Sequence, residues 1–329
     1  MKIAFTLCSN NYLAQAITLR DSFLFHHPGY KFYIGLVDSL DNLPNLIEDT
    51  NDFIPVANLV IPEFNEMVQR YNITELNTSV KPFYFEYIFD KYNPEWIFYI
   101  DPDIYVYNRF EEVEMSLYNN NEVVLTPHIL SPVGDWDICY IREGLFNLGF
   151  VAFINSPSVK KFLNWWKQKM INQGFFSYQN NQFYDQLWMN FAVVFLKQPY
   201  ILIHPGYNVS GWNLHERIVL KDKNEFYIND LTTKLVFYHF SGLGFDNSTE
   251  EISKHAPGIT IRNRKDLEEI LTIYKRIVIS NNLKIYREIK PFYKHSEQRI
   301  LKKYFNKVIL KIIIMFKRII LKLENQLIS

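Results

Sequence analysis

The sequence has very few cysteines and no long apolar run. Cys8 and Cys139 are its two cysteines among 329 residues, which is too few for a disulfide-stabilised scaffold or for a metal site built from thiolates. This composition favours a protein that resides in the reducing cytoplasm. Since no stretch of about 18 apolar residues occurs, we expect no transmembrane helix. The chain starts directly with a strand-like segment, residues 2–7, so we also expect no cleaved signal peptide.

The sequence also lacks a net charge, because 35 Lys/Arg balance 35 Asp/Glu. The charges are unevenly spread: residues 297–329 contain eight Lys/Arg and two Glu, whereas residues 1–296 contain 27 Lys/Arg and 33 Asp/Glu. The positive excess therefore belongs to the C-terminal segment and the body is mildly acidic, so we expect no nucleic-acid partner. With 48% hydrophobic and 17% aromatic residues, the chain can bury a large core.

Apolar patterning predicts that strands and helices alternate along the chain. Strands are expected at residues 2–7, 32–37 and 56–61, and helices at 13–24 and from Ser79, with Pro82 in the first turn. Further on we expect a strand at 146–154, a helix that starts at Ser156-Pro157 and ends at Gly174, helices at 183–196 and 264–279, and short strands at 202–203 and 235–238. This alternation indicates βα units, and therefore an α/β fold around a mostly parallel sheet.

The most informative segment is an apolar run, residues 96–100, that ends in Asp101-Pro102-Asp103. In an open α/β sheet, ligands bind beyond the carboxyl ends of the strands, so we expect both carboxylates to face a crevice. Carboxylate oxygens suit a hard divalent cation such as Mg²⁺ or Mn²⁺. A second Asp-x-Asp, Asp135-Trp136-Asp137, lies among loop residues with no apolar strand before it, and we favour a plain loop there.

Several short motifs follow one another along the chain in a specific order. They are Ser9-Asn10-Asn11-Tyr12, Lys81, Asp101-Pro102-Asp103, Phe146-Asn147-Leu148-Gly149, Tyr184-Asp185-Gln186 and His239-Phe240-Ser241-Gly242. In this order they resemble the retaining glycosyltransferases of family 8. The resemblance spans residues 1–255 and depends on the order of the motifs. It implies a GT-A fold, a Rossmann-like, mostly parallel sheet flanked by helices, to which this chain adds a C-terminal helical extension.

The resemblance implies that Asp101, Asp103 and His239 bind Mn²⁺ or Mg²⁺, and that this metal ion bridges the diphosphate of a nucleotide-sugar donor. A divalent cation suits this role, because it stabilises the negative charge that develops on the diphosphate leaving group. The alternative for His239 is a structural histidine at the end of a strand.

The donor-binding residues follow from the same motifs, and they are Ser9, Asn10, Asn11, Lys81, Asp101, Asn147, Gly242 and Lys254. The first turn precedes a helix N-terminus, where amides can bind base, ribose or phosphate, although the same residues would serve equally as a helix cap. Asn147 is a candidate for binding a sugar hydroxyl, because an amide in a buried strand needs partners. The alternative for Lys81 is a solvated surface lysine.

Asp185 and Gln186 are the candidate catalytic residues. The resemblance places both side chains beside the sugar, where Asp185 accepts hydrogen bonds from hydroxyls. The amide oxygen of Gln186 then supports a transition state with oxocarbenium character. As the alternative, Asp185 caps the helix that follows it.

The chain departs from the family pattern at two positions. Family members have acidic residues near the first turn, where this chain has Ser9-Asn10-Asn11, so the base stays open, with a UDP-sugar favoured. Position 245, three residues after Gly242, is a phenylalanine where the family has a lysine. We expect Lys254 to replace that lysine beside the diphosphate.

A loop rich in aromatic and amide side chains contains Asn208, Trp212 and Asn213. Such composition is typical of carbohydrate surfaces, so these three residues are candidates for an acceptor site. The acceptor that we expect is a saccharide or a lipid-linked saccharide.

Residues 299–322 place eleven apolar side chains on one broad helical stripe, with lysines and an arginine alongside it. This pattern predicts a basic amphipathic helix that lies on an anionic membrane surface. The alternative is that the segment packs against the body or a second subunit. We therefore expect a cytoplasmic protein that is peripheral on the inner face of the cell membrane.

Together these features predict a metal-dependent, retaining glycosyltransferase that moves a hexose or related sugar from a nucleotide-diphosphate donor to a saccharide acceptor. We expect a GT-A domain at 1–258, packing helices at 259–296 and the basic tail at 297–329. Two alternatives stay open. A nucleotidyltransferase that makes nucleotide sugars has a similar sheet, but no Gly-rich, Arg/Lys-bearing triphosphate loop follows the first strand. A carbohydrate-binding or scaffold protein would keep the fold without turnover.

Overall fold

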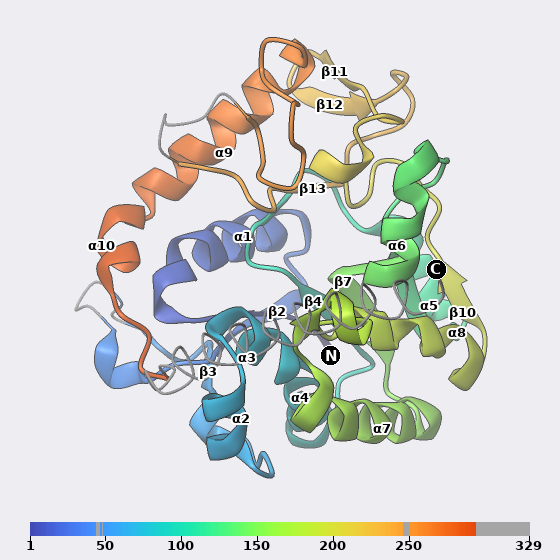
Figure 1. Cartoon of the computed structure of the whole chain (residues 1–329). Coiled ribbons are helices and arrows are strands. Elements are labelled where there is room, and N and C mark those ends of the chain that lie inside the picture. Colours follow the sequence, from blue (N-terminus) through green and yellow to red (C-terminus); the bar gives the residue numbers. More distant parts are fainter. Residues whose placement is uncertain (44–46, 48, 246–250, 294–329) are drawn as a thin grey trace, which may run out of the picture.

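The computed structural model describes residues 1–43, 47, 49–245 and 251–293, and its centre is a seven-stranded sheet (Figure 1). The strands lie in the order β10-β6-β7-β4-β1-β2-β3. Their bounds are β1 Lys2–Cys8, β2 Tyr30–Leu36, β3 Phe53–Pro55, β4 Trp96–Ile100, β6 Val123–Pro127, β7 Phe146–Ile154 and β10 Pro199–Ile201. Neighbouring strands are parallel, except that β7 runs antiparallel to both β4 and β6. The predicted α/β class with a mostly parallel sheet flanked by helices is confirmed.

Helices cover both faces of the sheet (Figure 1). On one face lies α1 (Leu13–His26), against which α9 (Glu268–Ser280) and α10 (Leu283–Glu288) pack in the same core, and on the other lie α2 (Phe64–Arg70), α3 (Ile73–Ser79), α4 (Lys81–Tyr92) and α7 (Pro157–Gln173). The remaining helices are α5 Glu111–Tyr118, α6 Asp137–Glu143 and α8 Ala192–Phe195. Three short antiparallel pairs complete the fold: β5 (Ile104–Val106) with β13 (Phe237–His239), β11 (Val219–Asp222) with β12 (Glu225–Ile228), and β8 (Phe176–Ser177) with β9 (Gln182–Phe183).

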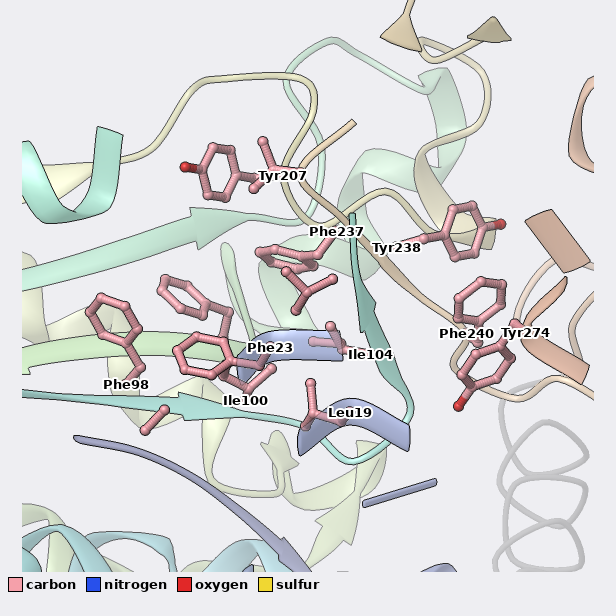
Figure 2. Packing of buried hydrophobic residues seen from close by; sticks show 14 of the residues in the cluster. Leu19, Phe23, Phe98, Ile100, Ile104, Tyr207, Phe237, Tyr238, Phe240 and Tyr274 are labelled. Atoms are coloured by element: carbon pink, nitrogen blue, oxygen red, sulfur yellow. The ribbon is translucent and has the colours of Figure 1, made fainter. Parts of the chain in front are cut away.

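Alternate side chains of the central strands enter two separate cores, because successive residues of a strand point to opposite faces. In β4, Phe98 and Ile100 belong to the core under α1, whereas Ile97 and Tyr99 belong to the core under α4. Figure 2 shows Phe98 and Ile100 close to Phe23 of α1. Burial on both faces explains why the strand preceding the two aspartates is apolar throughout.

The first of these cores extends toward the C-terminal helices. Phe240 follows β13, and its ring stacks on Tyr274 of α9 with centroids 3.8 Å apart (Figure 2). Asn281, just after α9, donates a side-chain hydrogen bond to Thr18 Oγ1 of α1 at 2.8 Å. In the described part of the chain, no helix is both long and apolar enough to cross a membrane.

Several predicted boundaries differ from the structure. The strand expected at 56–61 is β3 at Phe53–Pro55, and Val56–Asn58 form a 3-10 turn instead. Pro55 has no N–H with which to extend the ladder. Ser79 ends α3 rather than capping α4, whose N-cap is Val80, whereas Pro82 does lie in the first turn.

The other elements that differ are short. The helix expected at 183–196 is a 3-10 segment, Gln186–Phe191, followed by α8. The strands expected at 202–203 and 235–238 are β10 at Pro199–Ile201 and β13 at Phe237–His239. Ser156 caps α7 through Val159 N and Gly174 ends it, as predicted.

His27 is a buried histidine that uses both ring nitrogens. Its Nδ1 lies 3.1 Å from the Phe23 carbonyl, and its Nε2 accepts a hydrogen bond from Phe110 N at 3.0 Å. The ring therefore has to be neutral, with its proton on Nδ1. Burial lowers the pKa of His27 to about 4, against a partial opposing effect of the Phe23 carbonyl.

We expect the protein to lose stability as the pH falls from 6.5 toward 4. In this window the unfolded state binds a proton at His27 that the folded state excludes, so the free energy of unfolding decreases by at most about 3 kcal/mol from this residue. His27→Gln keeps one donor and one acceptor without a titrating ring. Urea unfolding of both proteins between pH 7 and 4 should show a shallower pH dependence in the variant, and parallel curves would contradict the assignment.

Candidate functional site

The pairing of β5 with β13 assembles a cluster of two aspartates and a histidine. Asp101 and Asp103 lie in the turn from β4 to β5, where Ile104 N donates to the Asp101 carbonyl at 3.1 Å. The antiparallel register places His239 opposite Ile104, and Phe240 N donates to the Asp103 carbonyl at 2.8 Å. Residues far apart in the sequence are thereby held together by backbone hydrogen bonds.

The three side chains are close enough to hold a metal ion. His239 Nε2 lies 3.0 Å from Asp103 Oδ1 and 3.6 Å from Asp101 Oδ2, and one ligand atom from each residue lies within 4.8 Å of the others. The side chain of His239 is 3% exposed, whereas those of Asp101 and Asp103 are 27% and 21% exposed. The imidazole is thus enclosed by protein, whereas the two carboxylates are partly exposed and accessible to a ligand.

Burial and charge act in opposite directions on these groups. Burial alone would raise the pKa of Asp103, but His239 beside it lowers that pKa below its ordinary value. Burial likewise would lower the pKa of His239, yet Asp103 raises it. For Asp101 burial prevails and raises the pKa, although Lys81 and His239 oppose it. Two carboxylates and an imidazole form a nitrogen and oxygen donor set that suits a divalent cation.

Gly149 of β7 lets the strand backbone lie directly against His239. A Cβ atom at this position would lie 2.4 Å from His239 Cε1 and 2.5 Å from its Nδ1, far inside van der Waals contact. Asp101 N donates to the Gly149 carbonyl at 2.7 Å, which ties the same glycine to the aspartate turn. The glycine that ends the Phe146–Gly149 motif thus lets the backbone of β7 contact the His239 ring, and any larger residue would prevent this contact.

A cavity of about 540 Å³ opens beside this cluster. It lies at the carboxyl ends of β1 and β4, where open α/β sheets bind their ligands. Twelve of the fifteen residues predicted from the sequence line it: Ser9, Asn11, Lys81, Asp101, Asp103, Asn147, Asp185, Gln186, Trp212, His239, Gly242 and Lys254. The structure therefore brings most of the candidate residues to one cavity.

Lys81 and Asp185 form a buried ion pair in the cavity wall. Lys81 Nζ lies 2.6 Å from Asp185 Oδ2, and the two side chains are 2% and 4% exposed. The same ammonium group lies 4.0 Å from the ring centroid of Tyr99, whose hydroxyl donates to Asp101 Oδ1. Burial raises the pKa of Asp185, and Lys81 opposes that rise. Lys81 is thus neither a surface lysine nor free, because it neutralises Asp185.

Gln186 and Asn147 both line the cavity and share a neighbour, His128. Asn147 Oδ1 accepts from Gly149 N at 3.0 Å, and Gln186 Nε2 donates to the Glu143 carbonyl at 2.9 Å. Both amide nitrogens face the ring of His128, a residue that we did not predict. His128 directly follows β6. Its position at the carboxyl end of a strand is the feature by which the sequence could have predicted it.

An acidic residue, Asp38, contacts the first turn, Ser9-Asn10-Asn11. Asp38 follows β2, and its Oδ2 accepts from Asn10 N at 3.1 Å. Its Oδ1 accepts from Ser39 N and from Phe292 N, both at 2.9 Å. The carboxylate is buried and points to backbone amides rather than into the cavity.

Lys254, the expected replacement for the family lysine, lines the cavity beside Gly242. Lys254 N donates to the Gly242 carbonyl at 3.1 Å, and Gly242 has a left-handed φ of 72°. Phe245 packs elsewhere, with the Arg287 guanidinium 4.7 Å from its ring centroid. The segment that follows Gly242 thus returns a lysine to the cavity.

Three predicted residues do not line the cavity. Asn10 is fully buried and donates to the Ser39 carbonyl at 3.2 Å. Asn213 is also fully buried, and its amide donates to the carbonyls of His128 and Asn208 at 3.0 and 2.9 Å. Asn208 is buried in the same loop. Of the predicted acceptor residues, the structure therefore brings only Trp212 to the cavity.

The second Asp-x-Asp, expected to be a plain loop, leads into helix α6, which forms one wall of the cavity. Trp136, just before α6, and Tyr140 and Glu143 within it line the cavity. The flanking aspartates do not, and Asp137 accepts from Val133 N at 2.8 Å as part of the helix start. In the second Asp-x-Asp, Asp137 thus stabilises the local backbone, and Trp136 lines the cavity.

Comparison with known proteins gives one sequence relative and several similar structures. No family model matches the chain. A Bacillus subtilis (strain 168) protein, uncharacterized protein YfnF, is 24% identical over 207 residues, which cover 58% of this chain and 64% of YfnF. The galactosyltransferase LgtC, crystallised with donor and acceptor sugar analogs, is 14% identical, with a TM-score of 0.48, over 85% of this chain and 96% of LgtC.

A second similar structure is the glycosyltransferase GlyE of Streptococcus pneumoniae TIGR4. It is 15% identical, with a TM-score of 0.49, over 86% of this chain and 64% of GlyE. The chain thus spans less than two thirds of both YfnF and GlyE.

Gly149→Ala should displace the His239 ring and weaken metal binding at the cluster. We expect the affinity for Mn²⁺, measured by calorimetric titration, to fall by about tenfold or more, because the orientation of a ligating histidine depends on its immediate surroundings. Gly29→Ala is the matched control, since a Cβ there meets nothing within 4 Å. Equal Mn²⁺ affinity in both variants and the wild type would show that His239 does not bind the metal.

Proposed function

We propose that the chain is a metal-dependent glycosyltransferase that moves a hexose or related sugar from a nucleotide-diphosphate donor to a saccharide acceptor. The observation that carries the proposal is that Asp101, Asp103 and His239 meet at the rim of a cavity of about 540 Å³ that Asp185 and Gln186 also line. A volume of this order suits a ligand of nucleotide-sugar size. The order of the sequence motifs supports the same function and a GT-A fold.

The three-residue cluster is the proposed metal site. Its two carboxylates and one imidazole fit Mn²⁺, or Mg²⁺ as the alternative. A bound cation would offset the negative charge that develops on the departing diphosphate. Lys254, which lines the cavity beside Gly242, supplies a second positive charge from the protein itself.

The remaining residues bind and orient the donor. Ser9 and Asn11 line the cavity beyond β1, and we assign them to the base and ribose of a donor that we expect to be a UDP-sugar. Asp185, held by Lys81 at 2.6 Å, is the proposed acceptor of sugar hydroxyl hydrogen bonds. The dipole of the Gln186 amide is the proposed support for positive charge on the sugar, which fits a retaining reaction.

The proposed acceptor is a saccharide that enters beside Trp212. Trp136 lines the same cavity, and the two indoles offer apolar faces of the kind that sugar rings contact. Asn208 and Asn213 are buried in the loop that carries Trp212, and the Asn213 amide donates to the His128 carbonyl. We therefore no longer assign either residue to acceptor binding.

We also propose that residues 297–329, which lie outside the described residues, attach the protein to the inner face of the cell membrane. The eight Lys/Arg of that segment would interact with anionic lipid at about 1 kcal/mol each. In this proposal residues 1–258 form the transferase domain and residues 259–296 form packing helices. A lipid-linked saccharide is the acceptor that such a location favours.

Asp103→Ala should abolish donor turnover. We expect wild-type protein to release nucleoside diphosphate from one member of a panel of UDP-, GDP-, dTDP- and CDP-sugars with Mn²⁺ but not with EDTA. The variant should lose about 100-fold or more of this rate, because it lacks a carboxylate that would hold the cation. Asp135→Ala, in the second Asp-x-Asp, is the matched control and should keep the full rate.

The outcome separates the alternatives. Release of pyrophosphate in place of nucleoside diphosphate would favour a nucleotidyltransferase. Silence across the panel, with no donor binding by calorimetry, would favour a carbohydrate-binding or scaffold protein.

Deletion of residues 297–329 should abolish binding to anionic phospholipid liposomes, because it removes the basic excess of the chain. Co-sedimentation with liposomes measures this loss, and neutral liposomes are the control. The truncated protein should still release nucleoside diphosphate at the wild-type rate. Unchanged co-sedimentation would exclude the tail as the membrane anchor.

A further inference from the structure

His128 faces two side-chain amides of the cavity through one ring nitrogen. Its Nε2 lies 3.3 Å from Asn147 Nδ2 and 3.5 Å from Gln186 Nε2. In both contacts the partner is the NH₂ end of an amide, which can donate but cannot accept. The contacts are therefore favourable only if Nε2 of His128 carries no proton and accepts from both.

Backbone contacts identify which end of each amide faces His128. Asn147 Oδ1 accepts from Gly149 N at 3.0 Å. Gln186 Nε2 donates to the Glu143 carbonyl at 2.9 Å, and its Oε1 faces Leu148 N at 3.4 Å. Turning either amide over would place like groups against each other at these positions. Their NH₂ ends have to face His128, so the ring proton has to be on Nδ1.

The surroundings of His128 keep the ring neutral. The residue is buried, and burial lowers the pKa of His128 to about 4, while the Gly144 and Leu145 backbone raises it in part. No hydrogen bond to its Nδ1 meets the usual geometric limits within the described residues. At neutral pH the ring thus accepts at one nitrogen and holds its proton on the other.

We propose that His128 is a positioning residue of the sugar subsite. As a neutral acceptor, it holds the NH₂ ends of Asn147 and Gln186. Each amide oxygen, which accepts from one backbone N–H, then presents its second lone pair to the ligand together with the Asp185 carboxylate. This part of the cavity is thereby specific for groups that donate hydrogen bonds, as sugar hydroxyls do. The inference rests on the proposed function and adds a residue that none of the sequence motifs contains.

The first test needs no ligand. Histidine labelled with ¹⁵N reports which ring nitrogen carries the proton, and a spectrum of the wild type at pH 7, assigned by comparison with His128→Gln, identifies the His128 signals. We expect an unprotonated Nε2 and a protonated Nδ1. A proton on Nε2, or on both nitrogens, would overturn the proposal.

The second test separates positioning from structural support. UDP-glucose, UDP-galactose and UDP are titrated with MnCl₂ present into wild type, His128→Gln and His128→Leu. His128→Leu should bind the better UDP-sugar about tenfold more weakly, the loss expected for misplaced hydrogen bonds. It should bind UDP as tightly as the wild type, because UDP does not reach the sugar subsite. His128→Gln offers an amide oxygen in place of Nε2 and should restore binding of the sugar nucleotide.

The outcomes distinguish this inference from the proposed function. If the wild type binds neither UDP-sugar, the UDP-sugar transferase fails while the ring-proton measurement still decides the role of His128. Unchanged UDP-sugar affinity in His128→Leu would overturn the positioning role. Equal losses for UDP and for UDP-sugar would do the same, because they would show a general structural defect.

Discussion

The site depends on one short antiparallel pairing, that of β5 with β13. Three residue pairs, from Phe237 opposite Val106 to His239 opposite Ile104, join segments that are more than 130 positions apart in the chain. Main-chain hydrogen bonds, rather than contacts among the three side chains, therefore bring Asp101, Asp103 and His239 together. The backbone thus fixes the positions from which the three side chains extend.

Alternation along β4 connects the packing of the core to the chemistry of the site. The side chain of Tyr99 belongs to the core under α4, yet its hydroxyl reaches Asp101, and its ring lies under the ammonium group of Lys81. Lys81 in turn neutralises Asp185. One aromatic side chain thus contacts both Asp101 of the Asp101-Asp103-His239 cluster and Lys81 of the buried ion pair, so both parts of the cavity wall pack on the same core.

The sequence predicted the features that depend on local pattern. The apolar β4 followed by Asp101, the cap at Ser156 and the α/β class all follow from periodicity and residue type. The roles of Asp38, His128 and α6 were missed, because each depends on distances between segments that pair only in the folded chain. Lys81 was predicted to lie near the donor, but its ion pair with Asp185 was not. The two residues are 104 positions apart, and no local sequence pattern indicates a charge pair at that separation.

The buried carboxylate of Asp38 links the two ends of the described chain. It accepts from Asn10 N in the first turn, and it accepts equally from Phe292 N, one residue before the described part ends. One buried side chain thus ties the turn that we propose for nucleotide binding to the last residues that the structure describes, and its loss would remove a hydrogen bond from both segments at once.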